Sequence, residues 1–540
     1  MPLNETICMS ECATGLLADD PQAFYLAFDL HKAPVNMSDP SDCGCPPQRE
    51  LILCFDGTGN TFRADGSESN ILKIFRMLDR KRENRFCYYQ PGIGKETTPG
   101  TFANAALRPF SNLPTHTIFE QAFASSFDEH VFSGYKFLAR RWQPGAKIYL
   151  FGFSRGAYTA RFLNEMLDFV GLLSADNEEL IPFVWQAFTS WKFAPPGKER
   201  DDAEASLRIS RDTLCRSIGW VDFLGLFDTV SSVASINWDF ETSNPIQPNP
   251  KTMRHAVSID ERRIKFQPVL FQDARGRRGE TRLARVSTWA ARSNSDLMSQ
   301  APFMLNPDFE EVYFAGDHSD VGGGWAADKW PVSQIPLMWM VQEATLAGLT
   351  FEHHQMTQMG CFDPHVEEYD PDIVRSAASA ELHDSLHYSD PGKTLETMFW
   401  RVLECFPFKR PKVAPDGSVQ DSRWHARGQR RPLPDNARIH SSVLYRLKHD
   451  PEYRPYNLGL GNRSVGDDGC VDMGKWQRVS HHGLCEYFIR IFEGRDTTNQ
   501  NREREREREQ ERQREVDERQ QEEQIREEIN RGRLRHGQTV

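Results

Sequence analysis

The chain contains 540 residues, has a formal net charge of −12 and is 39% hydrophobic. This length allows more than one domain, or one large domain with insertions, and the apolar content suffices for a sizeable core. The acidic balance argues against a nucleic-acid partner, because the sequence lacks a sustained basic stripe that could neutralise phosphates.

Residues 1–48 are predicted to form a disordered tail rich in Asp, Ser and Pro. The start of the chain lacks the basic and apolar regions of a secretory signal. No stretch of the sequence approaches the ~18 uninterrupted apolar residues of a transmembrane helix. We therefore expect a cytoplasmic protein, with export by a route that uses no such signal as the alternative.

Four of the eleven cysteines lie in this tail, at Cys8, Cys12, Cys43 and Cys45. Four thiolates could hold a metal. However, the tail has few other ordering signals, and C-x₂-C pairs are absent from it. We expect no metal site.

Residues 49–345 alternate strand-like and helix-like segments, which predicts an α/β fold with a mostly parallel sheet and helices on both faces. The predicted strands are Glu50–Phe55, Arg85–Gln90, Lys147–Phe153, Ile218–Phe227 and Glu311–Ala315. The predicted helices are Thr117–Trp142, Ala157–Val170, Asn177–Trp191 and Val332–Ala347. The run from Pro91 to Pro114 is expected to be a long loop beside the active edge of the sheet.

The rest of the chain is predicted to form an extension and a tail. Residues 346–495 have weaker periodicity and indicate a helical cap packed on the core, broken by a polar Arg/Pro surface loop from Lys409 to Arg438. Residues 496–540 are almost entirely Arg, Glu and Gln, without a sustained heptad seam. We expect a charged tail that is disordered or partly helical. An oligomerisation coil is the alternative, so the oligomeric state stays open.

The segment Gly152-Phe-Ser-Arg-Gly156 is the strongest candidate for chemistry. It follows the apolar run 148–151 and opens into a helical pattern, which is the context of a nucleophile elbow. We predict Ser154 as the nucleophile. Gly152 and Gly156 are predicted to organise the turn, because they lack the side chains that would block close packing of strand and helix. An ordinary turn is the alternative interpretation.

A serine nucleophile needs an imidazole base and an orienting carboxylate. In folds with a nucleophile elbow, the three residues follow along the chain in the order Ser, Asp or Glu, His. Asp228 ends one hydrophobic run and His318 follows another, so we predict them as acid and base. Asp228 could instead cap a turn, and His318 could be a structural loop histidine. The competing acids and bases are Asp317, Asp320, His440 and the pair His481-His482.

The segment 51–60 predicts a buried strand that runs into a glycine-rich turn. The backbone N–H groups of Gly57 and Thr58 could form an oxyanion hole together with that of Arg155. Asp56 is predicted to organise this turn through its carboxylate. In the rival interpretation Asp56 is a phosphate-transfer nucleophile or a metal ligand.

Six motifs occur in the order typical of one family. They are Cys54-Phe-Asp-Gly-Thr-Gly-Asn60, Pro91-Gly-Ile-Gly94, Gly152–Arg161, Phe227-Asp-Thr-Val230, His255–Arg262 and Gly316–Gly324. Over roughly residues 49–345 the chain resembles the family that includes the type VI secretion lipase effectors of phospholipase type. The resemblance implies an α/β-hydrolase core, a Ser154–Asp228–His318 triad and phospholipase or esterase activity.

The sequence thus predicts a serine hydrolase that cleaves carboxylic esters, with lipid esters as the expected substrates and no cofactor. Peripheral contact with a membrane is possible for such an enzyme. Two alternatives remain open. One is a catalytically silent scaffold, and the other is an esterase or thioesterase with a non-lipid acyl substrate, because lid and pocket residues decide specificity.

Overall fold

The computed structural model describes a large part of the chain. The described residues are 6–7, 48–57, 67–92, 115–194, 197–230, 250–263, 266–270, 308–325, 329–387, 397–398, 401, 410–413, 419–422, 428, 430–434, 436–460, 473–480 and 484–491. The N-terminal cysteines, most of the predicted loop at 91–114 and the charged tail lie outside them.

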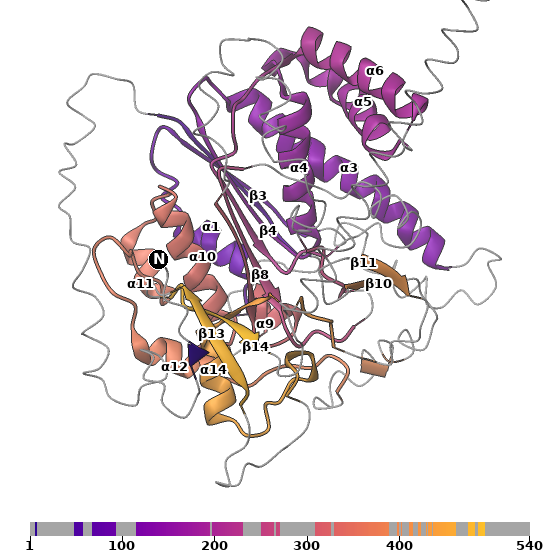
Figure 1. The fold of residues 1–540 in the computed structure, drawn as a ribbon. Helices are drawn as coiled ribbons and strands as arrows, with labels where there is room; N and C mark the ends of the chain where they lie inside the picture. The colour runs from indigo at the N-terminus through magenta and orange to yellow at the C-terminus, as the bar shows by residue number, and fades with distance from the viewer. Residues whose placement is uncertain are drawn as a thin grey trace, which may run out of the picture. The chain divides into compact units, whose positions relative to one another are not determined.

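A ten-stranded sheet runs through the described part of the chain (Figure 1). Its strands, in spatial order, are β1 (Thr6–Ile7), β13 (Lys475–Ser480), β14 (Tyr487–Ile491), β12 (Arg438–His440), β9 (Asp308–Phe314), β8 (Thr252–Ser258), β7 (Phe223–Phe227), β4 (Lys147–Phe153), β2 (Glu50–Phe55) and β3 (Arg85–Gln90). The strands from β12 to β3 are all parallel. β14 pairs with β12, and β1 with β13, in antiparallel fashion.

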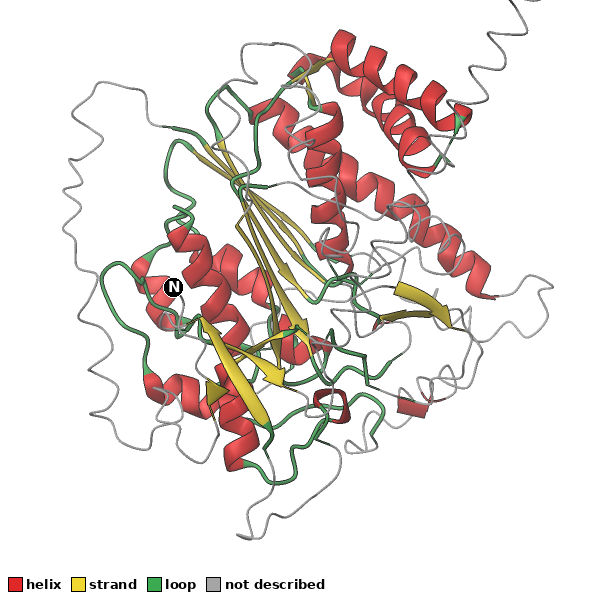
Figure 2. Ribbon diagram, viewed as in Figure 1, coloured by secondary structure: helices red, strands yellow, loops and turns green. Residues whose placement is uncertain are grey.

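Helices cover both faces of this sheet, as Figure 2 shows. The α-helices are α1 (Asn70–Met77), α3 (Thr115–Arg141), α4 (Arg155–Val170), α5 (Ile181–Phe193), α6 (Lys198–Leu214), α9 (His318–Gly322), α10 (Gln334–Leu346), α11 (His353–Gln358), α12 (Pro371–Ser379) and α14 (Ser441–His449). The 3₁₀ helices are η3 (Ala175–Leu180) and η9 (Tyr456–Leu458). Two small antiparallel strand pairs also form: β5 (Leu172–Leu173) with β6 (Cys215–Arg216), and β10 (Arg410–Val413) with β11 (Val419–Ser422).

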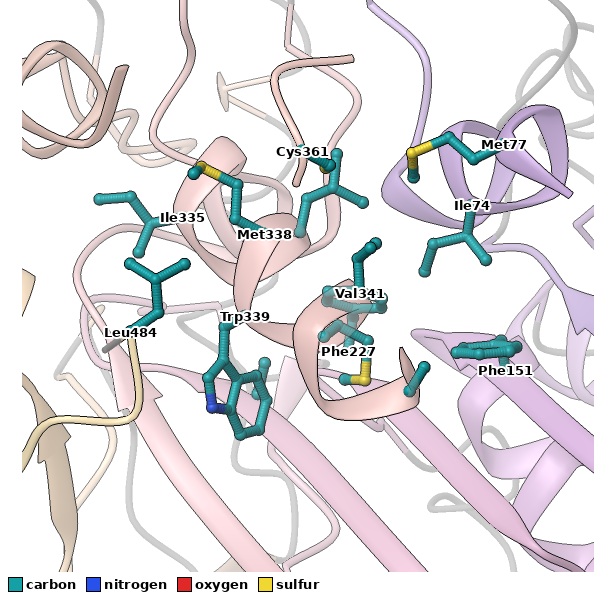
Figure 3. Close-up of a cluster of buried hydrophobic side chains, with 14 of the residues drawn as sticks. Ile74, Met77, Phe151, Phe227, Ile335, Met338, Trp339, Val341, Cys361 and Leu484 are labelled. Atoms are coloured by element: carbon teal, nitrogen blue, oxygen red, sulfur yellow. The ribbon is translucent and has the colours of Figure 1, made fainter. Parts of the chain in front are cut away.

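Successive side chains of the central strands enter two different cores, because side chains alternate between the faces of a strand. On β2, Leu51 and Leu53 join the core that contains residues of α3, α4 and α5. Ile52 and Cys54 join the opposite core, which contains residues of α1, α10, α11 and α12. Figure 3 shows part of the second core, where Trp339 of α10 lies among aliphatic and aromatic side chains. The sheet is therefore buried on both faces, as a parallel sheet requires.

The structure confirms the predicted α/β fold, and the first three predicted strands have the expected bounds. The predicted strand at 218–227 is shorter, since only 223–227 forms β7. Just before β7, the carboxylate of Asp222 accepts a hydrogen bond from the Ile148 N–H at 2.9 Å. The sequence did not predict β8 as a strand, because Arg254 and His255 interrupt its apolar pattern. Both side chains are buried and paired with carboxylates, Arg254 with Asp308 and Glu343, and His255 with Glu311.

The region predicted as a helical cap differs from that prediction. Besides α11, α12 and α14 it contributes β12, β13 and β14 to the main sheet. These strands are short, and their apolar residues pack in a third core with Val257 and Tyr313 of β8 and β9. The described residues up to Arg490 belong to one compact unit. Among the helices that the structure describes, none combines the length and apolar character needed to cross a bilayer.

Candidate active site

Ser154 lies between the end of β4 and the start of α4. Its backbone has φ 58° and ψ −125°, a region that non-glycine residues rarely adopt. A Cβ atom on Gly152 would lie 2.4 Å from the Ala157 Cα, and one on Gly156 would lie 2.3 Å from the Phe55 carbonyl oxygen. Only glycine at both positions lets the strand and the helix approach this closely. The local sequence therefore forms the sharp turn that was predicted.

His318 is the first residue of α9, just beyond the end of β9. Its Nε2 lies 2.8 Å from the Ser154 Oγ. The aromatic rings of Phe153 and Phe266 pack against the imidazole, with centroid distances of 4.7 and 4.8 Å. Asp317 caps α9, because its carboxylate accepts hydrogen bonds from the backbone N–H groups of Ser319 and Asp320. The imidazole is thus held in place by ring packing and by a capped helix start.

Asp228 follows β7 and completes the chain of hydrogen bonds. Its Oδ2 lies 2.6 Å from the His318 Nδ1, and its Oδ1 accepts from the Ser258 N–H at 3.0 Å. The residue is fully buried and has φ 37°. The structure therefore brings together the three residues that the sequence predicted as nucleophile, base and acid.

A fourth buried group, Arg431, was not predicted. Its guanidinium binds the Asp228 carboxylate in bidentate fashion, with Nη1–Oδ1 at 2.6 Å and Nη2–Oδ2 at 2.8 Å. Arg431 lies in the Arg/Pro stretch predicted to be a surface loop, yet it is only 1% exposed, so that prediction is wrong for this residue. Nothing in the local sequence distinguishes it from the neighbouring Arg430.

Burial, hydrogen bonds and nearby charges shift the pKa values of Asp228 and His318. Burial by itself would raise the pKa of Asp228, but the Arg431 guanidinium and the His318 hydrogen bond outweigh it and hold that pKa well below 3.8. Burial lowers the pKa of His318 below 6.5, although the hydrogen bond with Asp228 opposes this change. These shifts favour a charged Asp228 carboxylate beside a neutral His318 imidazole.

Glu261 and Arg263 form a second buried ion pair beside His318, with Arg263 Nη2 2.7 Å from Glu261 Oε2. Glu261 accepts a hydrogen bond from the backbone N–H of His318 at 3.2 Å. Burial would raise the pKa of Glu261, but the Arg263 guanidinium lowers it to about 2. The sequence contained a signal for this residue, because Glu261 lies in the motif 255–262.

The carboxylate of Asp56 lies at the turn after β2. Its Oδ1 accepts from the Gly57 N–H at 2.6 Å, and its Oδ2 accepts from the hydroxyls of Ser69 and Tyr89, each at 2.6 Å. Ser69 in turn caps α1. Thr58, the other predicted donor of this turn, lies outside the described residues. Arg155 begins α4, and burial lowers the pKa of its guanidinium to about 10.

The alternative candidates have other partners. Asp320 binds the backbone N–H of Asp317 and the backbone and ring of His383. His440 lies 2.8 Å from the Ser442 Oγ and 2.7 Å from the Leu484 carbonyl oxygen, and burial lowers its pKa to about 4. The pair at 481–482 lies outside the described residues. Within the described part of the chain, no group of three or more His, Cys, Asp or Glu residues has the arrangement of a metal site.

The parallel sheet, the strained serine between strand and helix, and the ordered Ser, Asp and His define an α/β-hydrolase-like fold. The family model for the type VI secretion system phospholipase effector Tle1-like catalytic domain matches residues 49–343, and the chain belongs to this family. The chain is also 26% identical over 565 residues to an uncharacterized protein of Saccharomyces cerevisiae, YEL023C, with 78% of this chain and 82% of the relative covered. Membership of the family supports a hydrolase.

Proposed function

We propose that the protein is a serine hydrolase that cleaves carboxylic esters of lipids. The observation that carries the proposal is the continuous pair of contacts from Ser154 Oγ to His318 Nε2 at 2.8 Å and from His318 Nδ1 to Asp228 Oδ2 at 2.6 Å. A serine hydroxyl is a weak nucleophile until an adjacent base activates it, and an imidazole base is oriented by an acid. The lipid class of the substrate comes from the phospholipase family.

In the proposed mechanism, Ser154 Oγ attacks the ester carbonyl while His318 Nε2 accepts the serine proton. The imidazolium then donates that proton to the leaving alcohol, and an acyl-serine ester remains. His318 next activates a water molecule, which releases the fatty acid and restores the serine. Asp228 holds the tautomer of His318 and stabilises its charged form.

The developing negative oxygen needs N–H donors. We assign this role to the Arg155 backbone N–H at the start of α4 and to the turn that contains Gly57 and Thr58. In the structure the Gly57 N–H binds the Asp56 carboxylate. Its participation therefore requires that this hydrogen bond be exchanged for one to the substrate oxygen. Asp56 then acts as the organiser of the turn.

The nucleophile is tested by labelling with a fluorophosphonate probe, which reacts only with activated serines. We expect Ser154→Ala to abolish labelling and to lower turnover of a p-nitrophenyl ester by a factor on the order of 10⁶. The matched control is Ser190→Ala, on the exposed side of α5, which should behave like the unmodified chain. Undiminished labelling of the Ser154 variant would remove this serine from the mechanism.

The substrate class needs a separate experiment. Phospholipid vesicles, neutral acylglycerols, acyl thioesters and short water-soluble esters are incubated with the protein, and released acids are measured by mass spectrometry. We expect acid release from vesicles, with peripheral contact at the lipid surface. Release from thioesters or short esters alone would favour the non-lipid alternative. A chain that neither labels nor turns over any ester would be the silent scaffold.

A further inference from the structure

Arg431 lies outside the segment that matches the family's catalytic domain, which ends at residue 343. The proposed acid, Asp228, lies 203 positions earlier in the chain. We propose that Arg431 is a positioning residue that orients the Asp228 carboxylate toward His318, so that the C-terminal extension completes the active site. This inference rests on the proposed triad and adds a residue to it.

The carboxylate of Asp228 is held at both oxygens. Oδ1 accepts from the Ser258 N–H at 3.0 Å and from Arg431 Nη1 at 2.6 Å. Oδ2 accepts from His318 Nδ1 at 2.6 Å and from Arg431 Nη2 at 2.8 Å. A planar guanidinium bound at both oxygens fixes the plane of the carboxylate, which a single hydrogen bond would leave free to rotate. Arg431 therefore determines the direction from which Oδ2 meets the imidazole.

Arg431 is itself held rigidly from several sides. Its guanidinium also donates to the carbonyl oxygens of Ser258 and Phe266. Its own carbonyl oxygen accepts from the Asn457 side chain at 3.0 Å, and the same amide group donates to the carbonyl oxygen of Ile259 at 2.8 Å. The segment around Arg431 is thus bound to the loop after β8, and little further ordering is needed when a substrate binds.

Neighbouring contacts attach the same segment to that loop. The Gly428 carbonyl oxygen accepts from Arg262 Nε at 2.6 Å, and Arg430 forms an ion pair with Asp260 at 3.1 Å. Arg430 has the same charge as Arg431 and is its direct neighbour, but it pairs with a carboxylate outside the triad. It therefore offers a matched control for the loss of one positive charge from this segment.

The charge of Arg431 has a consequence that a purely structural role lacks. A cation beside Asp228 opposes protonation of His318, so its removal should raise the pKa of His318. The Arg431 guanidinium also lowers the pKa of Asp228 and of Glu261, so both pKa values should rise in such a variant. Among the described residues, five charged groups besides Arg431 surround His318. They are Asp228, Glu261 and Arg263 from the packed elements and Asp317 and Asp320 on its own element.

The test compares full-length Arg431→Gln, Arg431→Lys and Arg430→Gln with the unmodified chain. For each protein, kcat and KM for a p-nitrophenyl ester are measured as a function of pH, and folding is checked by circular dichroism. We expect Arg431→Gln to lower kcat by about 10²-fold with little change in KM, because a misplaced acid leaves the base poorly aligned. The acidic limb of kcat/KM should move to higher pH.

Arg431→Lys separates charge from geometry, since lysine keeps the cation but cannot bind both oxygens in one plane. We expect this variant to fold, to keep the acidic limb near that of the unmodified chain, and to lose part of kcat. Arg430→Gln should keep both kcat and the pH of the acidic limb of kcat/KM. The inference is overturned if a folded Arg431→Lys or Arg431→Gln variant matches Arg430→Gln in kcat and in pH profile.

A wrong function and a wrong role for Arg431 give different results. If the unmodified chain shows neither fluorophosphonate labelling nor ester turnover, the proposed function is wrong and the inference falls with it. If the unmodified chain is labelled and active while the Arg431 variants are fully active, only the inference is wrong. Should Arg431→Gln not fold, the Lys variant still decides between these outcomes.

Discussion

Two residues of the site have backbone conformations that L-residues rarely adopt. Ser154 and Asp228 have φ 58° and 37°, and among the described residues no other non-glycine residue has a positive φ. Each such conformation costs on the order of 1–3 kcal/mol and persists only where the surroundings enforce it. Ser154 N–H donates to the Phe227 carbonyl oxygen at 3.0 Å, and Asp228 N–H donates to that of Ala256 at 2.7 Å. Neighbouring strands therefore hold both residues where their side chains reach His318.

The burial of His318 predicts the pH dependence of the proposed reaction. A general base must be neutral to accept a proton, and burial lowers the pKa of His318 below its usual 6.5. The imidazole therefore stays neutral at a lower pH than a free histidine. We expect the acidic limb of kcat/KM to lie below pH 6.5, measured with a p-nitrophenyl ester under conditions where the fold is intact. A limb clearly above that value would show that another group controls the rate.

At the scale of elements, the decisive feature is how closely α4 approaches β2 and β4. The Ala157 backbone lies where a side chain of Gly152 would be, and the Phe55 and Asp56 carbonyl oxygens lie where one of Gly156 would be. The close approach puts the start of α4, which carries the Arg155 backbone N–H, beside the turn after β2. These two turns come from segments about a hundred residues apart, and both belong to the proposed oxyanion site.

Gly156→Ala tests this approach. The added Cβ would lie 2.3 Å from the Phe55 carbonyl oxygen and 2.6 Å from that of Asp56, so the helix has to move. We expect the free energy of unfolding to fall by roughly 1–3 kcal/mol and fluorophosphonate labelling to slow strongly. The measurements are denaturant unfolding and the labelling rate.

The control for this substitution is Gly145→Ala, where φ is +85° and nothing lies within 4 Å of the added Cβ. It introduces backbone strain of about 1–2 kcal/mol without a steric contact. Labelling of this variant should stay normal. If Gly156→Ala also labels at the normal rate, the close approach of α4 is not needed for the proposed site.

At the scale of the molecule, the sheet does not stop where the family's catalytic domain ends. β12 adds in parallel to β9, and β14 then adds to β12. A buried hydrogen bond of 2.7 Å joins Trp339 Nε1 of α10 to the Tyr487 hydroxyl of β14. Core, extension and proposed site are therefore parts of one packed structure, and we expect them to lose structure together.

Tyr487→Phe is the corresponding test. It leaves the buried Trp339 N–H without this acceptor, which costs about 1–3 kcal/mol. We expect the midpoints of two denaturation curves, one from circular dichroism and one from fluorophosphonate labelling, to fall by the same amount. Tyr456→Phe is the control, because Tyr456 is 73% exposed. A variant whose labelling curve stays unchanged while its circular dichroism curve shifts would show that the extension unfolds independently of the site.

Patterns local in the sequence were enough for the central strands and for the elbow. Strands buried on both faces appear as short apolar runs, and a serine between two glycines at the end of such a run indicates a sharp turn. Chain order and strand ends likewise pointed to Asp228 and His318, which the structure places within hydrogen-bond distance of each other and of Ser154. Strands with buried charges, such as β8, do not show such an apolar run, because their polar residues are paired with carboxylates that are distant in the sequence.

Other features depend on contacts that no short window of sequence contains. The strands β12, β13 and β14 of the extension are only three to six residues long. They become recognisable only when β12 pairs with β9, the other two extend the sheet beyond it, and all three pack in the third core. Arg431 resembles any arginine of a polar loop until the chain folds back and buries it against Asp228. A buried charge is tolerated only with a partner, and here that partner lies 203 residues away. The residues of the proposed triad could thus be found from the sequence, whereas the guanidinium that binds the proposed acid could be found only from the tertiary structure.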